Sequence, residues 1–230
     1  MMLFYKAWRE SRNRFLVGLL ALAGFCSIMA LQKASGAPFT DRIFSDSLYF
    51  ELLVIVVGVG GLRQEKTHHT AAFTLTLPVS RLRLVAAHVV VGLAETTALA
   101  LVPTLMIGPL AALTHQSVAA GDALRYSLMR ILCGGFIFAV SFLFSVSFSG
   151  AYTAMVLSFA ALFMEGRIEW WVPSLRPYLV IPQAAMNGHW GYIGLRSIRD
   201  PFPIPGLLVM VAMAVALLWA AARITWNEDL

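Results

Sequence analysis

The chain alternates between long apolar runs and shorter polar segments. About twenty consecutive apolar residues cross the hydrocarbon core of a bilayer as a helix. On this criterion the sequence predicts six membrane-spanning helices, at residues 15–31, 47–62, 84–107, 127–148, 151–164 and 204–222. The second and fifth are short, and the break between the fourth and fifth rests on Ser149 and Gly150, which favour a tight turn. The pattern predicts an all-helical, polytopic membrane protein in which residues 1–230 form one domain.

Three polar segments flank these runs. In residues 1–14 the apolar side chains recur at helical spacing with charges on the opposite face, which predicts a helix lying in the membrane interface. A simple charged anchor for the first span is the alternative. Residues 165–203 are rich in Pro, Gly, Trp and Tyr, and they predict short, re-entrant-like helices dipping into the outer leaflet. The third segment, residues 64–83, connects the second and third predicted spans and carries Lys66, Arg81 and Arg83.

Composition and charge give the chain an orientation. The sequence is 59% hydrophobic and only 13% charged, which excludes an ordinary soluble domain. Its net charge of +5 suits cytoplasmic loops and anionic lipid headgroups, so nucleic acid is not expected as a partner. Cationic residues gather before the first span and between the second and third, at Lys6, Arg9, Arg12, Arg14, Arg63, Lys66, Arg81 and Arg83. The predicted location is therefore the cytoplasmic (inner) membrane, with both termini in the cytoplasm.

Two carboxylates fall inside apolar runs. A charged group near the bilayer centre costs about 2.5–3.5 kcal/mol on insertion scales, so such residues face a cavity or a partner. Glu95 has His88 seven residues before it on roughly the same helical face, which predicts either a packed, hydrogen-bonded carboxyl or a place in a translocation pathway. Glu51 and Arg130 lie at matching depths in their helices, which predicts a structural ion pair.

Metal binding and catalysis find little support in the sequence. Cys26 and Cys133 lie in apolar runs, and the adjacent His68 and His69 point to different sides of a helix, so no metal site is predicted. An intramembrane hydrolase built on Ser147 or Ser149 lacks the histidine base that such a site needs on the last span. The stretch "GVGGLRQEK" breaks the spacing of a phosphate-binding loop, so ATP hydrolysis is not expected on this chain.

Two segments resemble a known family. "FYKAWRESRNRFL" at the start and "GGLRQEKTHHTAAFTLTLPVSRLRLVAAH" after the second span resemble the opening and the first cytoplasmic loop of type-2 ATP-binding-cassette (ABC) transporter permeases. The six spans and the long outer segment between the fifth and sixth agree with that family. Two positions depart from its pattern: His69 stands where glycine is common before Thr70, and His88 stands where lysine is common.

The resemblance implies a function and its partners. Residues 64–83 would form a cytoplasmic coupling loop, in which residues 64–76 are a coupling helix that docks on a separate ATPase subunit. The coupling residues would be Gln64, Glu65, Lys66, Thr67, Thr70, Phe73 and Arg81. ATP and Mg²⁺ would be bound by that partner and no cofactor by this chain. A second permease subunit, identical or related, would complete a pathway that exports an amphipathic or hydrophobic substrate. The alternative is a noncatalytic membrane scaffold or sensor subunit.

Overall fold

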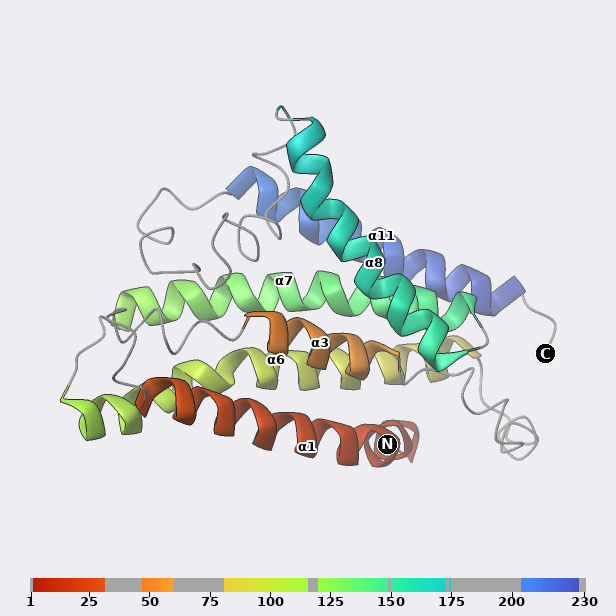
Figure 1. The fold of residues 1–230 in the computed structure, drawn as a ribbon. Helices are drawn as coiled ribbons and strands as arrows, with labels where there is room; N and C mark the ends of the chain where they lie inside the picture. The colour runs from red at the N-terminus through yellow and green to blue at the C-terminus, as the bar shows by residue number, and fades with distance from the viewer. Residues whose placement is uncertain are drawn as a thin grey trace.

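The described part of the chain is built from α-helices. The computed structural model describes residues 2–31, 47–59, 81–115, 120–148, 150–172, 174 and 204–227, and no strand is present among them. The helices are α1 (Met2–Leu31), α3 (Ser47–Gly58), α6 (Arg81–Thr114), α7 (Ala120–Ser147), α8 (Ala151–Trp171) and α11 (Ile204–Asn227) (Figure 1). The helix break predicted at Ser149 and Gly150 is present, because α7 ends at Ser147 and α8 begins at Ala151.

Four of these helices are long and apolar enough to cross a membrane. They are Leu3–Leu31, Leu82–Thr114, Ala123–Ser147 and Ile204–Trp226. The apolar parts of α3 and α8, Leu48–Gly58 and Ala151–Met164, are shorter. The protein is thus an all-helical, multi-pass membrane protein, and full crossings by the second and fifth predicted spans stay a prediction.

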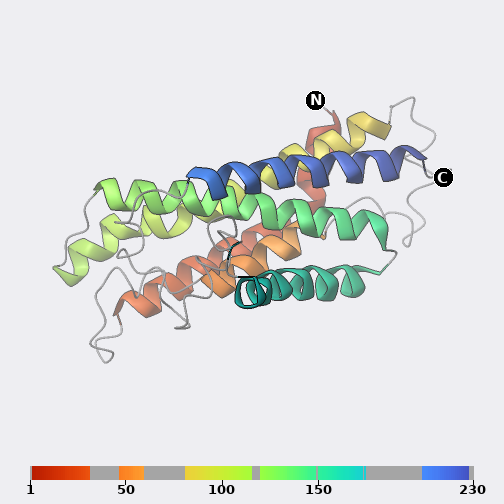
Figure 2. The ribbon, with the colours of Figure 1, turned by 90° about the horizontal axis from the view of Figure 1, so that it is seen from above.

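Several helices extend beyond their apolar runs. The first is unbroken from Met2 to Leu31, and its N-terminal turns bend away from the rest of the helix (Figures 1 and 2), although their place in the membrane interface stays a prediction. α6 continues through Pro103 and Pro109, which neighbouring helices make tolerable in membrane proteins. The predicted coupling helix at residues 64–76 and residues 175–203 of the outer segment lie outside the described residues.

The helices alternate in direction, so that α1 begins at the same end of the bundle where α11 finishes. α1, α6 and α8 start at the end of the bundle where α3, α7 and α11 finish (Figure 1). We call this the terminal end, because α1 begins there and α11 finishes there. α7 lies at the centre and contacts α3, α6, α8 and α11. Its apolar window is 67% buried, compared with 22% for α11, which leaves most of α11 for lipid or another subunit.

Small residues allow α3, α6 and α7 to approach closely. A Cβ atom added at Gly58 of α3 would lie 2.6 Å from the Ser141 Cβ of α7, and one at Gly92 of α6 would lie 2.3 Å from the Phe138 ring. Ser145 Oγ of α7 also donates a hydrogen bond of 3.1 Å to the carbonyl of Val59, at the end of α3. Such contacts supply packing where lipid removes the hydrophobic drive between helices.

Candidate functional site

Glu95 lies at the contact between α6 and α1. Its side chain is only 2% exposed, and its Oε1 accepts a hydrogen bond from Ser11 Oγ on α1. Ser11 Oγ also lies 3.1 Å from the Ala7 carbonyl and 3.3 Å from the Trp8 carbonyl. Because a hydroxyl has one proton, the carboxylate and these carbonyls compete for it, and an ionised acceptor forms the stronger bond.

The second carboxylate oxygen of Glu95 is buried without a hydrogen-bond partner among the described residues. Oε2 accepts no hydrogen bond from any residue that the structure describes. A buried polar atom of this kind costs about 1–3 kcal/mol unless something satisfies it. Glu95 Oε2, at the α1–α6 contact, therefore lacks a hydrogen-bond donor among the described residues.

His88 joins the same pair of helices one step nearer the terminal end. Its Nδ1 lies 3.0 Å from the Leu84 carbonyl, and since a carbonyl only accepts, Nδ1 carries the proton there. Its Nε2 lies 3.4 Å from Glu10 Oε2 on α1. The other Glu10 oxygen lies 3.8 Å from Lys6 Nζ. Polar groups thus lead from the half-exposed Glu10 inward to His88, whose side chain is 9% exposed.

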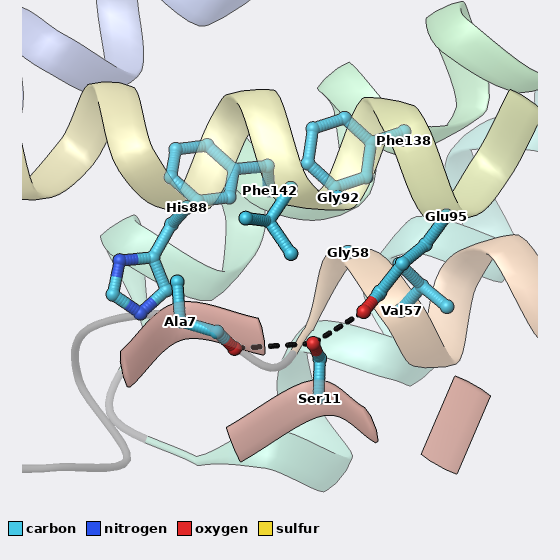
Figure 3. A pocket seen from close by; sticks show the side chains of 10 residues that line it. Ala7, Ser11, Val57, Gly58, His88, Gly92, Glu95, Phe138 and Phe142 are labelled. Atoms are coloured by element: carbon cyan, nitrogen blue, oxygen red, sulfur yellow. Dashed lines mark hydrogen bonds between the residues drawn. The ribbon is translucent and has the colours of Figure 1, made fainter. Parts of the chain in front are cut away.

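A small cavity connects these groups. It has a volume of about 20 Å³ and lies where α1, α3, α6 and α7 meet (Figure 3). Its lining residues are Ala7, Ser11, Val57, Gly58, His88, Val91, Gly92, Glu95, Phe138 and Phe142. His88 and Glu95 therefore share one face of α6, as their spacing predicts. A cavity needs roughly 10–15 Å³ to hold a water molecule, so this one admits water but not a drug-sized substrate, whose pockets measure about 300–1,000 Å³.

Arg130 occupies a second polar position, between α7 and α3. It is 6% exposed, its Nη1 donates to Tyr126 Oη over 2.6 Å, and its guanidinium lies 4.1 Å from the centre of the Phe50 ring. The Arg130 charge acts electrostatically on Glu51, the residue after Phe50 on α3. Direct pairing of Glu51 with Arg130 stays a prediction.

The structure adds partners that the sequence interpretation missed. The sequence could have indicated the contact between Tyr126 and Arg130, because residues four positions apart share one face of a helix. Ser11 gave no such signal, since it lies 84 positions from Glu95. Among the predicted coupling residues, only Arg81 is described, at the first position of α6. Gln64, Glu65, Lys66, Thr67, Thr70 and Phe73 lie outside the described residues.

Among the described residues, the other candidates for chemistry are single side chains. Cys26 on α1 and Cys133 on α7 are buried thiols. Within the described ranges no group of three or more His, Cys, Asp and Glu residues is placed to hold a metal ion. Ser147 ends α7 at the terminal end, whereas His115 follows α6 at the opposite end (Figure 1). These two residues are thus separated by the length of the bundle.

Comparison with known proteins does not narrow the class further. No protein-family model matches the chain, and a search of the curated proteins gives no match. The fold defines a helical, multi-pass membrane protein, and a finer assignment rests on the two resembling segments.

Proposed function

We propose that this chain is the membrane-spanning subunit of a type-2 ABC exporter. Two such permease subunits, identical or related, work with two ATPase subunits in the cytoplasmic membrane and move an amphipathic or hydrophobic substrate outward. The observation that carries the proposal is the resemblance of residues 60–88 to the first cytoplasmic loop of that family. The all-helical, multi-pass fold is compatible with it.

The arrangement of the helices supports a mechanical role for this loop. α3 finishes and α6 begins at the terminal end, so residues 60–80 connect two helices that both pack on the central α7 (Figure 1). α6 also contacts α1. A force applied to this connection therefore acts on α3 and α6 and, through their contacts, on α1 and α7. Coupling to ATP requires that the connection contacts the ATPase differently in its two states.

The charge distribution supports a cytoplasmic terminal end. Among the described side chains, cations gather near this end of α1, α6 and α11, at Lys6, Arg9, Arg12, Arg14, Arg83 and Arg223. Arg125 and Arg130 lie in the half of α7 that is nearer the opposite end. Cationic residues next to spans favour the cytoplasmic side, where an ATPase would bind.

The proposal is tested by purifying the tagged chain from its native membranes. The expected result is co-purification of an ATPase subunit that contains a phosphate loop, together with ATP hydrolysis by the complex. A chain that inserts normally but never associates with an ATPase would instead be the membrane scaffold or sensor subunit.

Two loop variants sharpen this test. Glu65→Lys reverses a charge at the start of the predicted coupling helix, and Phe73→Ala removes its apolar anchor. We expect both to insert normally and to lose ATPase association, with Phe73→Ala less sensitive to salt because apolar contacts are not screened. His115→Ala, exposed at the opposite end, is the matched control. Undiminished association in both loop variants would assign this segment to membrane topology alone.

A further inference from the structure

We propose that Glu95 is a proton-binding site, loaded from the terminal end of the bundle through Glu10 and His88. The proposal rests on the cavity and its polar lining, and it does not depend on the transport function proposed above. A proton on Oε2 turns this buried acceptor into a donor, while Oε1 keeps its bond from Ser11.

The size and lining of the cavity select the ligand. About 20 Å³ gives room for a single water molecule beside Glu95 and Ser11. Calcium takes six to eight oxygen ligands and magnesium demands an octahedron, whereas the side-chain oxygens lining this cavity come from Glu95 and Ser11 alone. A proton needs one acceptor atom, and the water beside it satisfies the resulting O–H.

The route follows the polar groups between α1 and α6. Glu10 is half-exposed, and its Oε2 lies 3.4 Å from His88 Nε2. When Nε2 is protonated, both ring nitrogens donate, one to Glu10 and one to the Leu84 carbonyl. The protonated ring then turns so that Nε2–H leaves Glu10 and faces the cavity, where the Nε2–H bond breaks as its proton passes to a water molecule. An O–H bond of that water breaks as a proton bonds to Glu95 Oε2. His88 is left neutral with its Nδ1 proton in place, and a proton from the solution restores the charge.

The charges around the site come from two helices. On α1, Lys6 Nζ lies 3.8 Å from Glu10 Oε1, and Arg14 is the cation whose charge acts on Glu95. On α6, His88 is the other titratable group lining the cavity. α3 and α7 line it with apolar side chains and glycine. Proton uptake therefore changes the charge balance of the α1–α6 contact and leaves the α3 and α7 walls unaltered.

Infrared difference spectroscopy tests the site. The chain is reconstituted in lipid nanodiscs, and spectra are compared across a pH series in the region of the protonated carboxyl C=O stretch. We expect a band that grows as the pH falls, is lost in Glu95→Gln and persists in Glu51→Gln, the matched carboxyl on α3. A spectrum in which Glu95→Gln removes no titrating band would overturn the proposal.

The same band tests the route. On transfer to heavy water it shifts as the carboxyl exchanges its proton for deuterium. We expect this exchange to be several-fold slower in His88→Phe and in Glu10→Gln, and unchanged rates in both would refute loading through these residues. If Glu95→Gln does not fold, Ser11→Ala replaces it, since loss of the bond to Oε1 must shift the band of Glu95 and no other carboxyl.

A final arm separates the proton from a metal ion. Replacing sodium chloride by choline chloride at each pH should leave the midpoint of the titration unchanged. A midpoint that moves to lower pH as sodium rises would show that a metal ion competes for the carboxylate, and the site would then be a cation site rather than a proton site.

Discussion

At the scale of single residues, one hydroxyl forms a hydrogen bond between two membrane helices. Ser11 Oγ offers its proton to Glu95 across the α1–α6 contact, while carbonyls of its own helix lie within 3.3 Å. Serine in a helix ordinarily bonds to the carbonyl one turn back, as Ser27 does with Ala23 at 2.8 Å. The buried carboxylate is what draws Ser11 into an interhelical bond.

Ser11→Ala should therefore weaken the α1–α6 contact. Hydrogen bonds between membrane helices average about 0.6 kcal/mol and reach about 1.7 kcal/mol. We expect a loss near the upper value, because the variant leaves both oxygens of Glu95 without a described donor. The free energy of unfolding, measured in detergent or bilayer by steric trapping, checks this.

Ser27→Ala is the matched control for this measurement. It lies on the same helix and its hydroxyl bonds only to the backbone of α1 among the contacts described for it, so its removal should change stability very little. Equal costs for Ser11→Ala and Ser27→Ala would show that the bond to Glu95 contributes nothing.

The sequence singled out Glu95 and His88 but did not predict their contact with α1. Glu95 and His88 stood out because ionisable groups in an apolar run are expensive, and their seven-residue spacing placed them on one face. Ser11 did not stand out, since a serine costs little in a membrane helix and its partner is set by tertiary packing. The cavity depends on Gly58, Gly92 and the Phe138 ring meeting at one level, which no local pattern encodes.

At the scale of helices, the features of the sequence that set the length of a helix differ from those that set its contacts with other helices. Apolar runs mark the part of a helix that matches hydrocarbon, so they predicted the six helices but ended before the C-terminal ends of α6, α8 and α11. α6, for example, runs to Thr114 and α8 to Trp171, because the backbone hydrogen bonds of a helix continue beyond the residues that match the hydrocarbon. Contacts between helices depend instead on where small residues permit close approach.

Gly58→Ala should separate α3 from α7. The added methyl would lie 2.6 Å from Ser141 Cβ and 3.2 Å from the Phe138 carbonyl oxygen, and neither is the end of a flexible side chain. Overpacking of this kind costs about 1–3 kcal/mol. Gly24→Ala on α1 adds the same methyl where nothing lies within 4 Å, so thermal unfolding in detergent should show a lower midpoint for Gly58→Ala alone. Indistinguishable midpoints would mean that the helices shift apart without cost.

A double-mutant cycle tests the predicted pair between α3 and α7. Glu51→Gln and Arg130→Gln should each destabilise the protein, by about 3 kcal/mol or more if a buried charge is left without its partner. Arg130→Gln should cost more, because it also removes the bond to Tyr126 and the contact with the Phe50 ring. Unfolding free energies of both single variants and the double variant supply the measurement. The double change should cost less than the sum, and strict additivity would show that Glu51 and Arg130 do not interact.

At the scale of the whole molecule, the alternating directions of the helices bring cations from different helices to one end of the bundle. This asymmetry indicates how the bundle is oriented in the membrane. The described cations near the terminal end belong to three helices that are far apart in the sequence, yet the fold brings them to one end of the bundle (Figure 1). The sequence alone reached the same grouping by counting predicted spans, an argument that fails if a single span is miscounted. The structure supplies a common end without reference to the number of full crossings.

Cysteine labelling in intact cells and in inverted vesicles tests this orientation. With Cys26 and Cys133 replaced by alanine, the variants Arg9→Cys and Trp226→Cys report on the terminal end, and His115→Cys reports on the other. Because cations near spans favour the cytoplasm, we expect a membrane-impermeant maleimide to label the first two only in inverted vesicles and the third only in intact cells.

Segments outside the described residues should follow the same division. Cysteines placed within residues 64–76 should label with Arg9→Cys, because the helices on either side of residues 60–80 meet the terminal end, and cysteines within residues 185–200 should label with His115→Cys, because α11 starts at the opposite end. A reversed pattern would place the terminal end outside and remove the ATPase from reach of the loop. Labelling of Arg9→Cys and Trp226→Cys from opposite sides would contradict the fold itself, since it requires an odd number of crossings between two positions that the bundle holds at one end.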